Sequence, residues 1–200
     1  MTWIKQEPEL PHDPFFFGYG SLVNTATHVY DRHHRARLDG WRRVWRHTPF
    51  REMAFLTAEP FEGSYIDGLI AAVPGADWAA LDLRETGYDR VPLDRGISHE
   101  AVQAGEIAVY HIPEGKHGPA DGDRPILMSY LDVVVQGYLQ VFGAEGGQHF
   151  FDTTAGWDGP ILNDRAQPLY PRAQLLREEE TSFVDRALAK MGARIVEAEG

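Results

Sequence analysis

The chain has 200 residues, the length of one large domain or of one domain with an extension. It contains no cysteine, which excludes thiol catalysis, cysteine metal sites and disulfide bonds. Its 19 basic and 30 acidic residues give a formal charge of -11, which would repel a phosphate backbone and argues against a nucleic-acid partner. The longest apolar runs are about five residues, whereas a membrane span takes about 20, and the N-terminus has no basic and apolar leader. We therefore expect a cytoplasmic protein with no membrane partner.

The first part of the chain is predicted to form strands. Residues 1–14 carry three prolines among acids, which indicates an extended N-terminal arm. Residues 15–17 are phenylalanines in front of a glycine-bounded turn, a pattern typical of a buried strand. Asn24 is the predicted start of a helix. Residues 38–58 are predicted to form two or three short strands, with a turn at Asp39–Gly40.

Further strands and one short helix are predicted before residue 115. The strands cover residues 65–73, 88–93 and 106–112, where branched and aromatic residues gather. The helix covers residues 78–84, and Asp77 is its expected cap.

The last third is predicted to be mainly helical. Residues 115–123 are polar and rich in glycine and proline, which makes them the best internal boundary. Apolar residues recur at helical spacing over residues 126–141, and a second helix is expected to start at Ser182 and end at Gly192. The predicted divisions are an arm (1–14), a core (15–117) and a mainly helical C-terminal extension packed on the core (118–200).

The segment 18–22 (GYGSL) places two glycines where a strand ends. Glycine lets backbone N–H groups converge, and such a concavity can bind an anion or a developing oxyanion. The dinucleotide-binding pattern needs a third glycine where Val23 stands, and neither the P-loop nor the nucleophile-elbow pattern fits. By spacing alone, the segment is either a structural turn or a ligand-binding loop.

Glu85 lies at the end of the predicted helix. One interpretation is a solvated carboxylate paired with Arg84 or Arg90. The other is a general base that dips into a cavity beside Leu83 and Tyr88.

The histidines and arginines carry no clear site pattern. The nine histidines are scattered without metal-ligand spacing, so no metal site is predicted. Six arginines fall within residues 32–46, and we interpret them as a solvated face, or else as a source of one cation for an anionic substrate group.

Several motifs, in this order, resemble the signatures of the gamma-glutamylcyclotransferase superfamily, which includes ChaC-like, AIG2-like and gamma-glutamylamine cyclotransferase-like branches. The resemblance covers about residues 15–112. It rests on residues 17–22 (FGYGSL), 38–41 (LDGW), 67–73 (DGLIAAV), 81–90 (LDLRETGYDR) and 109–110 (VY).

The resemblance implies an α+β fold in which a small mixed, barrel-like sheet carries short helices. It also implies an enzyme that cyclises the gamma-glutamyl group of a small peptide or amine to 5-oxoproline and releases the amine, with no cofactor. Glu85 would be the general acid and base. The substrate would be bound by Tyr19, Gly20, Ser21, Leu22, Tyr88 and Tyr110.

Two other classes of function stay open. A non-catalytic module that binds a small molecule could share the same scaffold, since fold and activity are separable. A metal-dependent hydrolase would need at least three histidines to converge, for which the sequence offers no spacing.

Overall fold

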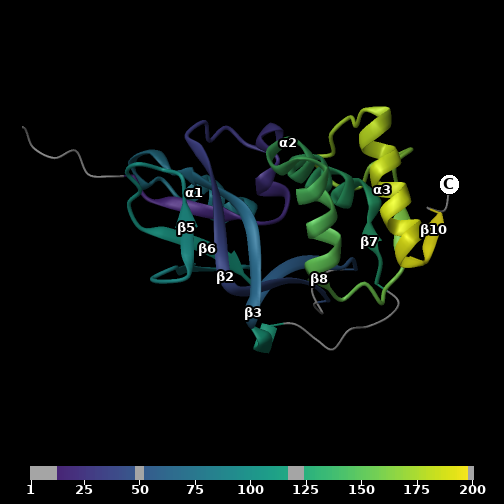
Figure 1. The fold of residues 1–200 in the computed structure, drawn as a ribbon, viewed down its shortest axis with the longest axis horizontal. Coiled ribbons are helices and arrows are strands. Elements are labelled where there is room, and N and C mark those ends of the chain that lie inside the picture. The colour runs from purple at the N-terminus through teal and green to yellow at the C-terminus, as the bar shows by residue number, and fades with distance from the viewer. Residues whose placement is uncertain (1–12, 48–51, 117–123, 198–200) are drawn as a thin grey trace, which may run out of the picture.

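A computed structural model describes residues 13–47, 52–116 and 124–197, and its larger sheet has the strand order β4-β6-β1-β3-β2-β5 (Figure 1). The sheet is mostly antiparallel. It is also open, because its edge strands do not pair with each other within the described residues. Its strands are β1 (Phe15–Gly18), β2 (His33–Arg46), β3 (Phe55–Ala72), β4 (Asp89–Pro92), β5 (Ile97–His99) and β6 (Ile107–His111), with β8 (Thr154–Ala155) added beside β2. The expectation of an α+β fold is confirmed, although the sheet bends without closing into a barrel.

The central strand is β1, as the run of phenylalanines predicts. It pairs antiparallel with β3 and parallel with β6, so neither of its edges is free. Phe15, Phe16 and Phe17 are each at most 2% exposed, so aromatic side chains fill the space on both faces of the sheet. This buried strand carries the segment 18–22 out of the middle of the sheet.

The predicted turn at Asp39–Gly40 is wrong, because the chain continues there in one long strand. Asp39 pairs with Tyr65 and Trp41 with Pro60, so the extra residues of β3 bulge away from β2. Gly40 and Gly63 have φ angles of +76° and +81°, which glycine adopts without the strain of a side chain. The glycine pattern thus marks an irregularity within a hairpin of two long strands.

Short 3-10 turns replace the helix expected from Asn24. They are η1 (Ser21–Val23) and η2 (Thr25–Thr27), and the Asn24 side chain accepts a hydrogen bond from the N–H of Ala26. The same side chain donates to the carbonyl of Val133 at 3.0 Å. Asn24 therefore fastens these turns to the C-terminal part of the chain.

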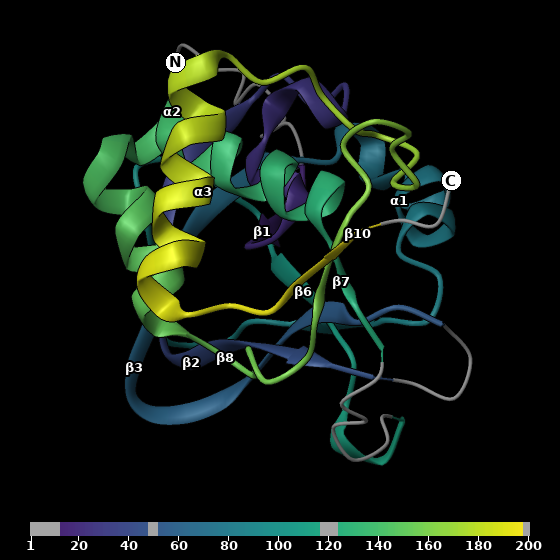
Figure 2. The same ribbon diagram turned by 90° about the vertical axis from the view of Figure 1, so that its right-hand side faces the viewer.

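The C-terminal part contains two helices and a small sheet. The helices are α2 (Met128–Thr153) and α3 (Glu178–Met191), and the sheet contains β7 (Ile126–Leu127), β9 (Ile161–Asn163) and β10 (Ile195–Glu197). Figure 2 shows α3 lying along α2. In the small sheet β9 is the middle strand, with β7 on one side and β10 on the other. Buried residues of α2, α3 and the larger sheet belong to one hydrophobic cluster.

The helix ends are partly as predicted. The predicted helix over residues 126–141 corresponds to α2, which is interrupted at Gly143 (φ +69°) and continues beyond it. The predicted start of α3 at Ser182 is wrong, since the helix begins at Glu178 with Glu180 accepting from the N–H of Arg177. Gly192 ends α3 in the left-handed conformation (φ +67°), as predicted.

Three smaller features complete the fold. They are the helix α1 (Ala79–Arg84) and the 3-10 turns η3 (Pro74–Ala76) and η4 (Glu114–Lys116).

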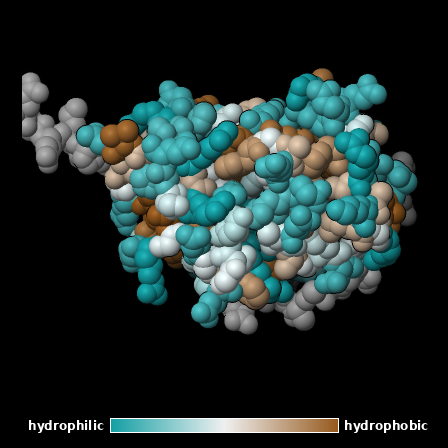
Figure 3. Space-filling model, viewed as in Figure 1, coloured by the Kyte–Doolittle hydropathy of each residue, from teal (hydrophilic) through white to brown (hydrophobic). Residues whose placement is uncertain are grey.

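Hydrophilic side chains cover most of the face shown in Figure 3, with hydrophobic ones gathered in small groups. None of the helices described is both long enough and apolar enough to cross a membrane. The predicted N-terminal arm lies outside the described residues, apart from residues 13 and 14.

Candidate active site

The segment 18–22, which we call the diglycine loop, is tightly enclosed. A Cβ atom at Gly18 would lie 2.7 Å from the Cβ of Leu22, and one at Gly20 would lie 2.8 Å from the hydroxyl of Tyr130. Such contacts are too short for a side chain, so a substitution at Gly18 would have to move the Leu22 main chain, and one at Gly20 would have to displace the Tyr130 hydroxyl. The close approach of Tyr130 also shows that α2 covers this loop.

Glu85 follows the last turn of α1 and lies in the same cavity as the diglycine loop. Its N–H donates to the carbonyl of Leu81 at 2.9 Å, and Leu81 is 1% exposed, so a buried side chain anchors this end of the helix. The Glu85 side chain is 17% exposed and does not extend into bulk water. The cavity has a volume of about 30 Å³ and is lined by Phe17–Leu22, Leu56, Glu85, Tyr88, Tyr110 and Tyr130.

Arg84 links Glu85 to the diglycine loop. Its Nε lies 3.1 Å from Oε1 of Glu85, and its guanidinium donates to the carbonyl of Thr27 at 2.8 Å and to Oγ of Ser21 at 3.2 Å. The Arg84 side chain is 8% exposed, so these hydrogen bonds are shielded from water. Glu85 therefore forms the predicted ion pair with Arg84 and also lines the cavity. The interpretation as a paired carboxylate and the interpretation as a base in a cavity do not exclude each other.

The three tyrosines predicted to bind substrate all line this cavity, but their hydroxyl protons have protein acceptors. Tyr19 donates to the carbonyl of Tyr110 at 2.6 Å, Tyr88 donates to the carbonyl of Leu56 at 2.8 Å, and Tyr110 donates to the carboxylate of Asp82. Burial raises the pKa of Tyr19 and of Tyr110 well above the usual value, so both hydroxyls stay protonated. Their rings can shape the cavity, and their part in substrate binding stays a prediction.

Tyr130 is a site residue that the sequence analysis missed. Its hydroxyl lies against the diglycine loop, 2.8 Å from the position that a Cβ atom would take at Gly20. Burial raises its pKa well above the usual value, and the charge of Glu85 acts in the same direction. The helical pattern of residues 126–141 gave the position of Tyr130 on a helix, but no sequence signal directed its hydroxyl to this loop.

A second, larger cavity adjoins the first. Its volume is about 430 Å³, and it shares Ser21, Leu56, Glu85, Tyr88 and Tyr130 with the smaller one. The rest of its lining comes from Glu52–Phe55, Arg84, Leu127 and Leu169–Arg172. Glu85 therefore stands where the two cavities meet, and the C-terminal part supplies walls that the sequence analysis did not foresee.

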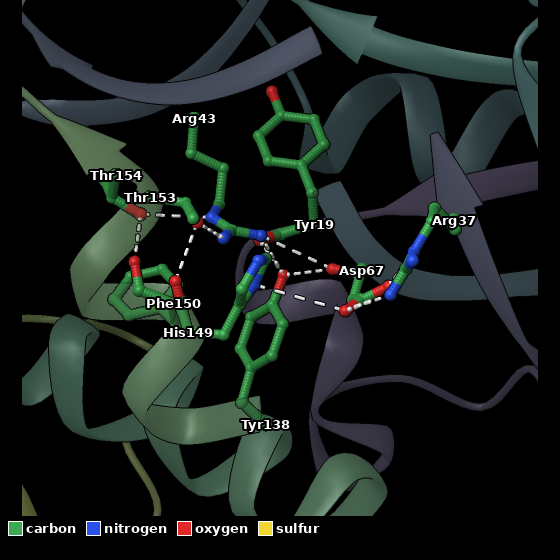
Figure 4. Close-up of polar contacts among 9 residues, drawn as sticks. All are labelled: Tyr19, Arg37, Arg43, Asp67, Tyr138, His149, Phe150, Thr153 and Thr154. Atoms are coloured by element: carbon green, nitrogen blue, oxygen red, sulfur yellow. Dashed lines mark hydrogen bonds and ion pairs between the residues drawn. The ribbon is translucent and has the colours of Figure 1, made fainter. Parts of the chain in front are cut away.

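A buried arginine holds the far side of the diglycine loop in place (Figure 4). Arg43 is fully buried and donates to the hydroxyl of Tyr138 at 2.8 Å. Because arginine only donates, the single proton of Tyr138 is left for the carbonyls of Tyr19 (3.0 Å) and Asp67 (2.7 Å). The interpretation of the arginine stretch as solvated is wrong for Arg43, which instead fixes the carbonyl of a loop residue.

We expect Tyr138→Phe to lower the free energy of unfolding by about 1–3 kcal/mol, because the carbonyl of Tyr19 loses this donor and that of Asp67 keeps only the longer bond from Arg43 at 3.4 Å. Chemical denaturation would measure this loss. Tyr30→Phe is the matched control, since the Tyr30 ring packs against Phe16 and its hydroxyl has no hydrogen-bond partner in the described structure. Equal stability of the two variants would show that the Tyr138 hydroxyl does not support the loop.

Three other arginines of residues 32–46 pair with acidic side chains away from the cavities. Arg37 binds Asp67, and Arg42 and Arg46 both bind Glu59. Neither cavity has an arginine of this stretch in its lining. In the described part of the chain, no three histidine or acidic side chains form a group that could hold a metal ion.

Comparison with solved structures identifies the fold of this chain. No family model and no curated protein matches the sequence. A solved structure described as a gamma-glutamyl cyclotransferase matches 88% of this chain and 99% of its own at 14% identity, with a TM-score of 0.55. An uncharacterized protein from Homo sapiens matches 87% of this chain and 99% of its own at 13% identity, with a TM-score of 0.56.

A third solved structure, YkqA from Bacillus subtilis, matches 72% of this chain and 56% of its own at 16% identity, with a TM-score of 0.52. The order of strands and helices therefore defines an α+β protein with an open, mostly antiparallel sheet. More narrowly, the chain has the gamma-glutamylcyclotransferase fold, as the sequence motifs predict.

Proposed function

We propose that this chain is a gamma-glutamylcyclotransferase that converts the gamma-glutamyl group of a small peptide or amine to 5-oxoproline. The observation that supports this proposal most strongly is the position of Glu85, which lies between a glycine-built loop and a cavity large enough for a small leaving group. The fold shared with a gamma-glutamyl cyclotransferase agrees with this chemistry.

The reaction that we propose is an intramolecular acyl transfer. The α-amine of the substrate loses a proton to Glu85 and attacks its own γ-carbonyl carbon, which forms the C–N bond of a five-membered ring. The tetrahedral intermediate then expels the original amine, and Glu85 returns the proton to the leaving nitrogen. These bond changes consume no oxidant, reductant or cofactor.

The enzyme's main task in this reaction is to hold the substrate folded. An intramolecular attack in the right geometry can reach an effective molarity of about 10⁵ M or more. In our proposal, the backbone N–H groups of the diglycine loop bind the substrate carboxylate or the oxyanion, while Glu85 faces the α-amine. Because the Tyr130 hydroxyl already lies against this loop, an anion bound there would contact or displace that hydroxyl.

A panel of gamma-glutamyl compounds distinguishes this function from its alternatives. We expect mass spectrometry to detect 5-oxoproline and free amine in equal amounts. Release of glutamate would instead indicate hydrolysis. Binding without any product would indicate a non-catalytic module, and either result would contradict the proposal. The panel includes gamma-glutamyl amino acids, peptides and amines, so that the released amine identifies the preferred leaving group.

A further inference from the structure

The larger cavity contains an arginine that comes from the C-terminal part of the chain. Leu169–Arg172, which we call the wall segment, lines this cavity together with Glu85. The smaller cavity, which holds the diglycine loop, does not include the wall segment. Any part of a substrate that extends from Glu85 into the larger cavity would therefore approach these residues.

The wall segment is firmly attached to the start of α2. Asp164 is 1% exposed, and its carboxylate accepts from the N–H of Ser129 at 2.7 Å, from the hydroxyl of Ser129 at 2.5 Å and from the N–H of Leu169 at 2.9 Å. One buried carboxylate thus caps α2 and fixes the first residue of the wall segment. The ring of Tyr170 then packs edge-on against Tyr130 at 4.9 Å between centroids.

A second attachment holds the turn that precedes the wall segment. Arg165 donates to both carboxylate oxygens of Asp132 on α2, at 2.7 Å each, and to Asp185 on α3 at 2.7 Å. Such bidentate pairs have a defined geometry. Arg172 is therefore presented by a segment with a fixed position.

The charges that line the larger cavity leave Arg172 without an internal partner. Arg84 is paired with Glu85 and also bonds to Thr27 and Ser21. Among the described residues, the guanidinium of Arg172 makes no ion pair and no hydrogen bond, and Glu52, the other charged residue of the lining, is exposed and forms no ion pair with it. A half-buried cation in a cavity without a partner indicates an anionic ligand.

We propose that Arg172 binds a carboxylate on the amine that leaves, so that the preferred substrates are gamma-glutamyl amino acids or peptides rather than gamma-glutamyl amines that lack a carboxylate. This inference rests on the proposed function. A guanidinium matches a carboxylate through two parallel hydrogen bonds, which gives it both affinity and orientation. In this arrangement Glu85 meets the scissile nitrogen, and Arg172 meets the far end of the leaving group.

Gamma-glutamylalanine and gamma-glutamylethylamide form a matched pair of substrates, because they differ only by the carboxylate of the leaving group. We expect kcat/KM of the wild type to be about 10–100-fold higher for gamma-glutamylalanine, the range for a hydrogen bond to a charged group. Arg172→Gln should bring this ratio close to one, and Arg172→Lys should keep part of it. Circular dichroism would verify that the variants are folded.

Arg186→Gln is the matched control, since Arg186 is an exposed arginine of α3 that lines neither cavity. It removes the same charge and should leave the ratio unchanged. A wild-type ratio near one, or equal effects of the Arg172→Gln and Arg186→Gln substitutions, would overturn the role of Arg172 while leaving cyclisation intact. Absence of 5-oxoproline from both substrates would instead contradict the proposed function and this inference together.

Discussion

Glu85→Gln should lower kcat for 5-oxoproline formation by about 10²–10⁴-fold, the usual contribution of a positioned general acid or base. Glutamine has nearly the same shape and can still accept a hydrogen bond from Arg84, but it cannot take a proton from the α-amine. Substrate binding should change much less than kcat, because the diglycine loop is untouched. Steady-state kinetics with a product-specific assay would separate kcat from KM.

Glu100→Gln is the control for this substitution. Glu100 is exposed and lines neither cavity, so its replacement removes the same charge without altering the proposed site. We expect the control to keep wild-type kcat and both variants to stay folded at the temperature of the assay. If the Glu85→Gln variant kept kcat within twofold of the wild type, Glu85 would not be the base.

The largest loss of stability is expected from Gly68→Ala. A Cβ atom at this position would lie 2.3 Å from the carbonyl oxygen of Gly18 and 2.8 Å from the ring of Phe17. Because the nearest atom belongs to the backbone, the clash can be relieved only by moving β1 and β3 apart. Overpacking of this kind costs about 3 kcal/mol, which for a chain of this size lowers Tm by about 6–12 °C.

The clash would also displace the first residue of the diglycine loop, so activity should fall in the fraction that remains folded. Gly115→Ala is the matched control, since no atom of the described residues lies within 4 Å of its added Cβ. Calorimetry of both variants would compare the same chemical change in a crowded and an open place. A Tm for Gly68→Ala within about 2 °C of the wild type would show that the two strands can separate freely there.

Local signals were enough to predict the strand and the loop that carry the proposed site. Three phenylalanines in a row have no amphipathic pattern, so they indicate a strand buried on both faces, and β1 occupies that position. Glycines directly after such a strand indicate a close approach of other atoms, which Leu22 and Tyr130 make. Glu85 could be located at a helix end because the apolar spacing predicts α1. The predicted cap is wrong, since Trp78 is the N-cap of α1 without a side-chain hydrogen bond, and Asp77 accepts only a 3.3 Å bond from the N–H of Ala79.

Contacts between distant parts of the chain could not be predicted in this way. Nothing in the sequence around Tyr130 or Arg172 shows that each lines a cavity with Glu85, because the attachment depends on Asp164 reaching the start of α2. Composition likewise could not show which arginine of residues 32–46 is buried. Arg43 is buried because its partners, among them the hydroxyl of Tyr138, lie far along the chain, in that case 95 residues away.

The structure of the protein with bound 5-oxoproline is the most direct test of the proposed site. We expect the ring carboxylate to accept hydrogen bonds from N–H groups of the diglycine loop and the ring N–H to donate to the carboxylate of Glu85. The larger cavity should remain open beside the ring, where the leaving group would have been. Binding of 5-oxoproline only among the arginines of β2, or with its ring nitrogen far from Glu85, would contradict this account.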